Sequence, residues 1–324
     1  MYRTRLKQTQ RASRGQGREQ GLKQRSLIKS PYSKKAEEKR EQEKGGESLR
    51  LPFSGHRSIA EAAAEASADG YARLALQGSA SAVVTASNEA ATLPKVLFEL
   101  GKLPLREIIV VLNGCTDGSF ETVQRDPRVI RLSFPMRLGH DVGRAIGAAV
   151  ATGDIILFMD GDLPLPAEEL APFLLAVDRG ADVALNDISP FLPPFSRQDD
   201  VTRSKSYLNL SLGRPDLKAN SMTAVPHAIS RRALAATGTS ALVVPPKAQA
   251  IAMVHGLNVC APHSVNVLRG NRIRSGNTGA GNPVARLIIG DHIEALGEAM
   301  KIMGARLGTT RLSRSELAKA RNVP

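Results

Sequence analysis

Asp154-Ile-Ile-Leu-Phe-Met-Asp-Gly-Asp162 is a run of five apolar residues that ends in two carboxylates separated by one glycine. Such an uninterrupted apolar run is typical of a strand buried on both faces of a parallel sheet. Parallel sheets bind ligands beyond the carboxyl ends of their strands, where Asp160 and Asp162 stand. Alternate residues of an extended chain point the same way, so both carboxylates can face one divalent cation while Gly161 lets the backbone approach closely. The competing interpretation is an ordinary loop or a helix cap.

The composition indicates a globular protein and argues against two kinds of binding surface. The 324 residues are 42% hydrophobic, which is enough for a core in two average domains or one large α/β domain. Tryptophan is absent and aromatic residues make up 4%, which disfavours stacking platforms for single-stranded nucleic acid and aromatic clefts for carbohydrate polymers. Cys115 and Cys260 form no metal or redox spacing, so we expect a reducing compartment and no disulfide.

Positive charge is concentrated at the N-terminus. The formal net charge is +13, and residues 1–50 contain 15 Lys and Arg against 6 Glu, so +9 of it lies there. Because apolar residues are few, we expect a disordered basic arm over residues 1–56. The arm is either a solvated tail or a peripheral tether to anionic membrane or nucleic acid. No apolar run is long enough to span a membrane and none follows the basic start as a signal peptide would, which predicts a cytoplasmic protein without a transmembrane segment.

Strand and helix patterns alternate after an Ala-rich segment. We expect a linker helix within residues 57–78, a domain over 79–275, and a C-terminal amphipathic helix and tail over 276–324. The alternation predicts an α/β domain with a mostly parallel central sheet and helices on both faces. The expected strands are Ala82–Ala86, Glu107–Leu112, Arg128–Leu132, Ile155–Met159 and Asp182–Leu185. The expected helices between them are Ala91–Leu100, Phe120–Arg125, His140–Thr152 and Glu168–Arg179.

The alternation of strands and helices is interrupted at Asp187–Arg203, a proline-containing connection with apolar residues beside its prolines. Connections of this length are usually functional, and its apolar content favours a loop that packs over something. After this connection, we expect helices at Thr202–Leu212, Ser230–Thr237 and Lys247–His255 and a strand region at Asn258–Leu268.

The last predicted helix lies between Pro283 and Gly308 and carries one apolar stripe. Its opposite face mixes acidic and basic residues, unlike the basic face of a membrane-surface helix. The stripe predicts docking onto the core, with a dimer seam or a membrane contact as alternatives. Its residues are Ile289, Ile293, Leu296, Met300, Met303 and Leu307.

Polar residues follow the first two predicted strands. After the first strand, Ser87 or Asn88 with Glu89 can cap the next helix, or the Glu89 carboxylate can accept hydrogen bonds from a ribose diol. After the second strand, Asn113 opens a turn bracketed by glycines and offers an acceptor and two donors, so it could bind the edge of a base. A plain turn would have a similar sequence there.

A glycine-rich segment, Gly139–Gly147, begins a helix with His140 and Arg144 four residues apart. Arg144 would suit a diphosphate, because a guanidinium gives paired, charge-assisted hydrogen bonds. The alternative is that the glycines only allow close helix packing. Both interpretations place the start of this helix near the carboxyl ends of the strands.

The order and spacing of these segments resemble the family two glycosyltransferases of GT-A fold. The resemblance rests on Asn88-Glu89, Asn113–Ser119, Gly143-Arg144 with Gly147, Ala151–Asp154 and Asp160-Gly161-Asp162, and it covers about residues 80 to 270. It implies a nucleotide-sugar donor, a hydroxyl acceptor and Mn²⁺ or Mg²⁺. It also implies a nucleotide-binding half over 79–187 and an acceptor half over 188–275.

The resemblance assigns expected roles to particular side chains, with Glu89 near the ribose, Asn113 near the base, and the diphosphate bridged by the metal. A late histidine often ligates the metal in this fold, although a lone histidine is more often structural. The residues expected to bind the nucleotide are Thr85, Ser87, Asn88, Glu89, Asn113, Gly114, Asp117, Gly139, Arg144 and Asp160. The expected metal ligands are Asp160, Asp162 and His263, and the expected catalytic residues are Asp162, Arg144 and Asp187.

Two departures from the family pattern stand out. Leu112-Asn113 replaces the two acids with which the family usually begins its second motif, and an amide oxygen can still accept from a base imide. Inverting members carry a late Asp ahead of a helix, where Val243–Gln249 has no carboxylate. An inverting step needs a general base. The chain therefore recruits another acid, follows a retaining route like that of glucosyl-phosphoglycerate synthases, or has lost activity. The other acids are Asp187, Asp199, Asp200 and Asp216.

The function predicted from sequence is a metal-dependent transfer of a hexose from a nucleoside diphosphate sugar to an unidentified hydroxyl acceptor. A sugar-phosphate nucleotidyltransferase would need a glycine-rich, basic loop directly after the first strand, and Thr85–Glu89 contains no glycine. A non-catalytic domain that binds a nucleotide or a partner is the third interpretation, favoured by the missing late acid. A homodimer remains open.

Overall fold

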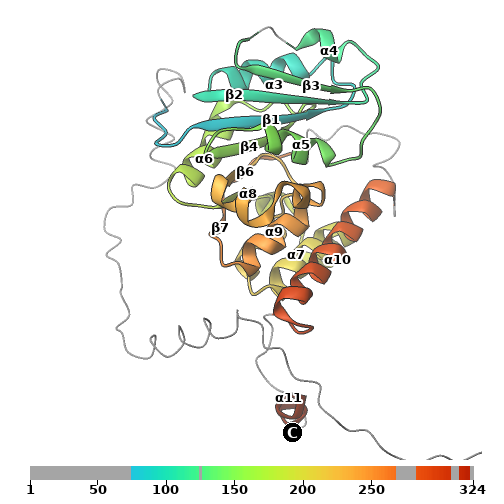
Figure 1. Cartoon of the computed structure of the whole chain (residues 1–324). Coiled ribbons are helices and arrows are strands. Elements are labelled where there is room, and N and C mark those ends of the chain that lie inside the picture. The colour runs from blue at the N-terminus through green and yellow to red at the C-terminus, as the bar shows by residue number, and fades with distance from the viewer. Residues whose placement is uncertain (1–73, 124–125, 268–281, 308–313, 322–324) are drawn as a thin grey trace, which may run out of the picture. The chain divides into compact units, whose positions relative to one another are not determined.

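The computed structural model describes residues 74–123, 126–267, 282–307 and 314–321. The expected basic arm and nearly all of the expected linker helix lie outside these ranges. Residues 74–78, the last part of the expected linker, form no helix. The remaining described chain forms a seven-stranded sheet with helices on both faces (Figure 1).

The strand order is β3-β2-β1-β4-β6-β5-β7. Neighbouring strands are parallel, except that β6 runs antiparallel to both β4 and β5. The strand order changes direction next to β1 and β4, so the carboxyl ends of these two strands flank the crevice in which open sheets bind ligands. The strands are β1 Ala80–Ala86, β2 Leu105–Asn113, β3 Val129–Phe134, β4 Ile155–Asp160, β5 Val183–Asn186, β6 His227–Ser230 and β7 Val259–His263.

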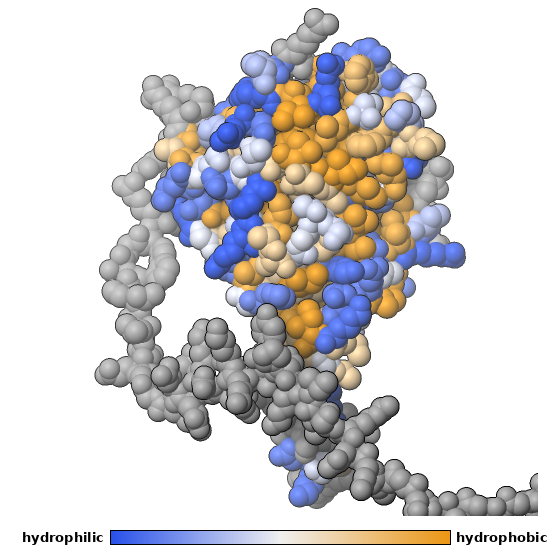
Figure 2. Space-filling view, in the orientation of Figure 1, coloured by the Kyte–Doolittle hydropathy of each residue, from blue (hydrophilic) through white to orange (hydrophobic). Residues whose placement is uncertain are grey.

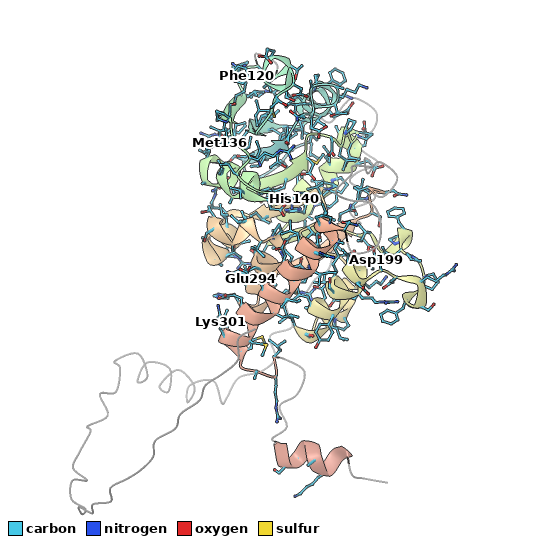
Figure 3. The ribbon with its side chains drawn as sticks, turned by 90° about the vertical axis from the view of Figure 1, so that its right-hand side faces the viewer. Phe120, Met136, His140, Asp199, Glu294 and Lys301 are labelled. Carbon is cyan, nitrogen blue, oxygen red and sulfur yellow. The ribbon has the colours of Figure 1, made fainter. Side chains whose placement is uncertain are left out.

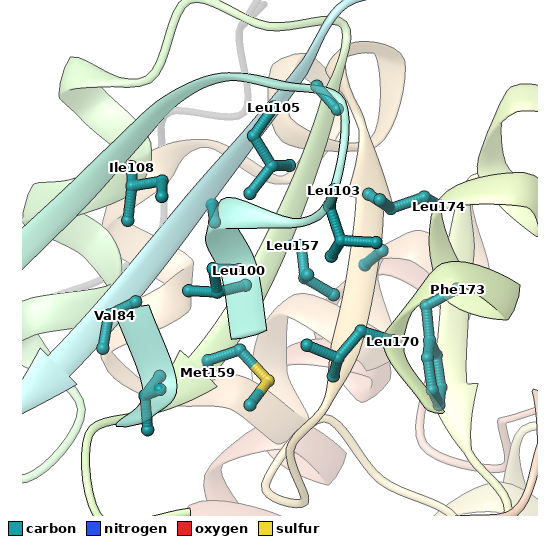
Figure 4. Packing of buried hydrophobic residues seen from close by; sticks show 14 of the residues in the cluster. Val84, Leu100, Leu103, Leu105, Ile108, Leu157, Met159, Leu170, Phe173 and Leu174 are labelled. Atoms are coloured by element: carbon teal, nitrogen blue, oxygen red, sulfur yellow. The ribbon is translucent and has the colours of Figure 1, made fainter. Parts of the chain in front are cut away.

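Two hydrophobic clusters fill the space between the sheet and its helices. One holds buried residues of α3 and α6, and Figure 4 shows Leu100, Leu157 and Phe173 in it. The other holds buried residues of α5, α8 and α9 on the opposite face. The helices are α3 Leu93–Gly101, α4 Ser119–Thr122, α5 Val142–Val150, α6 Ala167–Asp178, α7 Asp200–Ser211, α8 Arg231–Thr237, α9 Pro245–Val254, α10 Pro283–Met303 and α11 Arg314–Arg321.

The five strands expected in the first half of the domain are confirmed, as is the mostly parallel sheet. The strand β6 was not expected from the sequence, because its four residues carry no alternation that distinguishes them from a loop. It pairs with β4 from Phe158↔His227 to Ile155↔Ser230 and thereby brings residues of the second half beside the end of β4. The expected strand region Asn258–Leu268 is shorter in the structure, where it forms β7.

The Pro-containing connection between β5 and α7 contains two short 3₁₀ turns, Ser189–Phe191 and Phe195–Arg197. Phe195 is 69% exposed, and the Arg203 guanidinium lies over its ring at 5.6 Å. Cation–π contacts at exposed sites contribute little to stability. The expectation that this loop packs over the acceptor side stays a prediction.

The helix α10 docks onto the domain as expected, but through a different face. It packs on α9 and α7, and its buried residues are His292, Ala295 and Ala299. The predicted stripe flanks this contact, and within it Ile293 is 64% exposed and Met300 is 41% exposed. The stripe prediction was wrong in its orientation, because small alanines, rather than long apolar side chains, allow the close approach of helices here.

Among the described residues, no helix is both long enough and apolar enough to cross a bilayer. On the face of the domain seen in Figure 2, hydrophobic residues gather over the middle, and hydrophilic residues lie mainly around them. The cytoplasmic location and the contact of the arm with anionic lipid or nucleic acid remain predictions from the sequence.

The close approach of α5 to β1 generates a test of the fold. A Cβ on Gly147 would lie 2.3 Å from Val83 Cγ1, so even one methyl group cannot be accommodated without movement. We expect Gly147→Ala to lower the free energy of unfolding by about 1–3 kcal/mol, measured by urea denaturation. In the control Gly101→Ala, the nearest atom lies at 3.8 Å, and we expect no loss of this kind. Equal stability of Gly147→Ala and wild type would contradict the packing.

Candidate active site at the carboxyl ends of the strands

A pocket opens where β1, β2 and β4 end and α5 begins. Its polar lining combines carboxylates, one guanidinium, one imidazole, an amide and two hydroxyls. The lining residues are Thr85, Ala86, Ser87, Glu89, Asn113, His140, Asp141, Arg144, Asp160, Gly161 and Asp162. The structure therefore brings together most of the side chains that the sequence predicted to lie at the strand ends.

Asp160 is the last residue of β4, and one of its carboxylate oxygens is held by the protein. Thr85 Oγ1 donates to Asp160 Oδ1 at 3.0 Å, and Arg144 Nη2 lies 3.5 Å from the same oxygen. These contacts fix the carboxylate and leave Oδ2 as its second acceptor. Gly161 is required behind it, because a Cβ there would lie 2.8 Å from the Cβ of Ala86.

Arg144 is buried at 5% exposure and joins three parts of the structure. Its Nη1 lies 3.2 Å from Asp141 Oδ1 and donates to the carbonyl of Met222 at 3.1 Å, while Nη2 faces Asp160. Burial would lower the pKa of the guanidinium, but the charges of Asp141 and Asp160 raise it. Its hydrogen-bonding groups are therefore directed first to the protein, and Arg144 positions Asp160 and the loop around Met222.

Acidic side chains dominate the lining of the pocket. Glu89, Asp141, Asp160 and Asp162 contribute four carboxylates, and Arg144 contributes one positive charge. Carboxylate oxygens are the ligands that hard divalent cations prefer. Among the described residues, no group of three or more metal-ligating side chains occurs. A cation here would therefore take one or two carboxylates from the protein and its remaining ligands from substrate phosphates and water, as Mg²⁺ commonly does.

The loops after β1 and β2 are tied to each other by polar side chains. Asn88, with a φ of 62°, accepts at Oδ1 from the backbone N–H of Thr116 at 2.7 Å. Asp117 accepts from the N–H of Ala90 at 3.0 Å. Hydrogen bonds with Ser119 and Ala90 lower the pKa of Asp117 although desolvation opposes them. These two predicted nucleotide-binding residues hold the loops in place, whereas Ser87 Oγ is buried in the pocket without a hydrogen-bond partner.

Asn113 connects the end of β2 to the loop before α5. Its Oδ1 accepts from the N–H of Leu138 at 2.8 Å, and its Nδ2 donates to the carbonyl of Gly139 at 2.7 Å. One N–H and one lone pair remain for a base. The neighbouring Gly114 has a φ of 65°, and a Cβ there would lie 2.5 Å from Arg137 Cγ, so this turn needs glycine.

Six predicted site residues do not line the pocket: Asn88, Gly114, Asp117, Gly139, Asp187 and His263. The first four lie in the loops around it, and the last two follow or end other strands. His263 ends β7, and its Nε2 lies 2.8 Å from Glu169 Oε2 on α6. Asp187 follows β5 and accepts at Oδ1 from the Ser189 N–H and from Asn220 Nδ2. Burial raises the pKa of Asp187, but these hydrogen bonds outweigh it, so the pKa lies below its ordinary value.

The other acids considered as a general base already have partners. Asp199 caps α7 by accepting from the Thr202 N–H at 2.8 Å. Asp200 pairs with Arg203 at 3.4 Å, and Asp216 pairs with Arg214 at 2.7 Å. These contacts give each of the three a structural role.

The segment Val243–Gln249, which contains no carboxylate, ends in an amide. Gln249 on α9 is fully buried, accepts from the Met222 N–H at 2.8 Å and donates to Asn209 Oδ1 at 2.8 Å. It thereby holds the segment whose Met222 carbonyl receives Arg144. The neutral network stabilises the junction of the two halves without adding charge.

The sequence interpretation missed His227, a fully buried residue on β6. It stacks on Phe158 with ring centroids 4.9 Å apart, and its Nδ1 donates to the Ala224 carbonyl at 3.0 Å. Its Nε2 is buried without a hydrogen-bond partner. Burial, assisted by the charge of Arg144, lowers the pKa of His227 to about 3. No signal could have found it, because its position depends on the pairing of β6 with β4.

The sheet topology places the acidic pocket at the switch point of an open α/β sheet, where such sheets bind their ligands. Residues 81–234 match the model of glycosyl transferase family 2, a family of sugar-transferring enzymes. The family prediction from the sequence is confirmed.

Solved structures support the fold. Glucosyl-3-phosphoglycerate synthase from Mycobacterium tuberculosis in complex with uridine diphosphate is 19% identical, with a TM-score of 0.50, and the match covers 75% of this chain and 86% of that one. The same enzyme with Mg²⁺ and uridine diphosphate matches with the same identity and TM-score over 75% and 85% of the two chains. No curated protein sequence matches significantly.

The buried position of Arg144 generates a test of the charge network. Replacing Arg144 with Met leaves Asp141 and Asp160 without their counterion, and we expect a loss of about 3–5 kcal/mol in the free energy of unfolding at pH 8. The unpaired carboxylates then have raised pKa values in the folded state, so the loss should shrink at pH 5 as they take up protons. Urea denaturation at both pH values measures this.

The exposed pair between Arg203 and Asp200 provides the control, and Arg203→Met should cost less than about 1 kcal/mol at either pH. The same loss at pH 5 and pH 8 in Arg144→Met would contradict an electrostatic role for Arg144.

The buried imidazole of His227 predicts a pH dependence of stability. In the unfolded chain His227 is protonated below about pH 6.5, whereas in the folded protein it stays neutral until about pH 3. Stability should therefore fall as the pH drops from about 6.5, by up to about 1.4 kcal/mol per unit for this group. We expect His227→Phe to flatten this dependence in urea denaturation between pH 7 and 5. The exposed His255→Gln is the control, and an unchanged slope in His227→Phe would refute the assignment.

Proposed function

We propose that this glycosyltransferase moves a hexose from a nucleoside diphosphate sugar to a hydroxyl acceptor, with Mn²⁺ or Mg²⁺ at the acidic pocket. The observation that carries the proposal is the meeting of the Asp160 and Asp162 carboxylates in one pocket at the sheet's switch point. A diphosphate is itself an anion, so it can occupy this pocket only together with a cation. The Mg²⁺ and uridine diphosphate in the similar mycobacterial structure agree with this pairing.

The residues of the pocket fit a hard divalent cation. Oxygen ligands from Asp162 and from Oδ2 of Asp160 would hold it, and Thr85 with Arg144 would keep the Asp160 carboxylate oriented. When bound, the cation supplies Lewis-acid stabilisation of the charge that develops on the departing diphosphate.

The nucleoside would lie over the ends of β1 and β2. Glu89, 3% exposed in the lining of the pocket, would accept from the ribose diol, and the partnerless Ser87 Oγ would donate to or accept from the nucleotide. Asn113 would contribute its remaining N–H and lone pair to the base while it holds the Leu138–Gly139 loop. Because Asn88 and Asp117 bond to the loops, they would act by shaping the pocket.

The acceptor would enter from the side of the second half. Arg144 joins the two halves through the Met222 carbonyl, so the acceptor side is positioned relative to the donor by a buried contact. Asp187 is the acid of this half that lies at a strand end, and its lowered pKa keeps it ionised at neutral pH, as a proton acceptor requires. The connection at Ile188–Arg203 would cover this side as a lid.

A second candidate is a domain that binds the nucleotide without transferring sugar. It is favoured by the absence of a carboxylate in Val243–Gln249, where Gln249 has a structural role. In that case the pocket would bind a nucleoside diphosphate with Mn²⁺ and neither hydrolyse nor transfer the sugar. Both candidate functions therefore predict metal-dependent binding of a nucleoside diphosphate, but only the glycosyltransferase predicts turnover of the sugar donor.

Substitution of the metal-binding acid tests the proposal. We expect Asp162→Asn to lower donor hydrolysis or transfer by at least about 100-fold and to abolish the Mn²⁺ dependence of nucleoside diphosphate binding, because the cation loses a charged ligand. Calorimetry with uridine diphosphate and Mn²⁺, followed by a donor-hydrolysis assay over a set of nucleotide sugars, measures both effects.

Asp216→Asn is the matched control, since Asp216 is an exposed acid paired with Arg214, and its activity should equal that of wild type. Unchanged metal-dependent turnover in Asp162→Asn would refute the site. Metal-dependent binding by wild type without any turnover would favour the non-catalytic alternative.

A further inference from the structure

The side-chain amide of Asn113 is fixed by the backbone of the loop before α5. Its Oδ1 accepts from the N–H of Leu138 at 2.8 Å, and its Nδ2 donates to the carbonyl of Gly139 at 2.7 Å. In Figure 3 these two loop residues lie between the labelled Met136 and His140. Rotation of the amide by half a turn would set a donor against a donor and an acceptor against an acceptor. The loop therefore determines which way the amide faces.

An ionised carboxylate does not fit the same contacts. In an aspartate at position 113, the second oxygen would face the carbonyl oxygen of Gly139, which Nδ2 approaches to 2.7 Å. Two acceptors at such a distance repel each other. Asn113 is 9% exposed, so water does little to weaken this repulsion. The loop therefore favours an amide at a position where the family usually has an acid.

One hydrogen-bonding group of each kind is left on Asn113 once the loop is satisfied. The amide retains one N–H on Nδ2 and one lone pair on Oδ1. Asn113 lines the pocket together with Ser87, whose Oγ is buried without a hydrogen-bond partner. A hydroxyl can likewise donate or accept. Both side chains thus offer a ligand a donor as well as an acceptor.

The two pyrimidine bases differ in what they present to such a residue. Uracil presents a ring N–H donor between two carbonyl acceptors, whereas cytosine presents a ring nitrogen acceptor beside an amino donor. An ionised carboxylate only accepts, so it pairs with the uracil N–H and is repelled by the cytosine ring nitrogen. The amide of Asn113 can accept from the uracil N–H or from the cytosine amino group. It can also donate to a uracil carbonyl or to the cytosine ring nitrogen, so it rejects neither base.

We propose that Asn113 gives the base subsite a relaxed selectivity, so that the protein binds uridine and cytidine diphosphates with similar affinity. This inference rests on the proposed function, because it takes the base to lie over the ends of β1 and β2. It adds to that function the class of donor, since nucleotide sugars of either pyrimidine would then be accepted. Asn113 is the residue that determines this specificity, through an amide that the Leu138–Gly139 loop holds in place.

Calorimetry of the full chain with Mn²⁺ and each of the two diphosphates tests the proposal. We expect the dissociation constants of wild type for uridine diphosphate and cytidine diphosphate to agree within about tenfold. In Asn113→Asp, their ratio should shift by at least about tenfold in favour of uridine diphosphate, because the carboxylate offers cytosine no donor. The ratio is the readout, since a displaced loop in this variant weakens both ligands alike. The wild-type ratio decides the proposal even where Asn113→Asp does not fold.

Asn258→Asp is the matched control. Asn258 also donates from Nδ2 to a glycine carbonyl, that of Gly180, but it does not line the pocket, so both dissociation constants should equal those of wild type. A wild type that binds uridine diphosphate and rejects cytidine diphosphate by more than about 100-fold would overturn this inference and leave the proposed function standing. An unchanged ratio in Asn113→Asp would overturn it as well. A wild type that binds neither diphosphate with Mn²⁺ would refute both proposals.

Discussion

The buried guanidinium of Arg144 is the contact on which the arrangement of the site depends. It lies between Asp141 at the start of α5 and Asp160 at the end of β4, and it donates to the Met222 carbonyl in the second half of the domain. A buried positive charge is stable only with such partners, so helix, strand and loop must meet at one point. The same contact holds one carboxylate oxygen of Asp160 and so fixes the orientation of this side chain in the pocket.

Close backbone approaches make this meeting possible. Along α5, Gly143 and Gly147 face Thr85 and Val83 so closely that a Cβ at either position would lie 2.9 Å or less from them. Gly161 has the same relation to Ala86 behind the two aspartates. These glycines are therefore steric requirements of the fold. They allow α5 to approach the sheet closely, and this distance decides how deeply Arg144 on α5 is buried.

Much of the first half could be predicted from its sequence, since long apolar runs and helix periodicity report local burial. The second half was predicted less well. The strand β6 is short and gains its stability from pairing with β4, which no local pattern reports. In α10 the apolar stripe pointed to a core contact, whereas alanines form that contact and part of the stripe faces outward. Apolar periodicity shows that a helix has an apolar face, but it does not show which part of that face packs against the domain.

The sequence alone determined the α/β class, the positions of the first five strands along the chain and the place of Asp160 and Asp162 at a strand end, because each follows from neighbouring residues. Only the tertiary structure decided the roles of the polar side chains. It directed Asn88 and Asp117 to the loops, paired His263 with Glu169, and stacked His227 on Phe158. The physical reason is that a hydrogen-bonding group is satisfied by whichever partner folding brings within about 3 Å, and those partners lie far away in the chain.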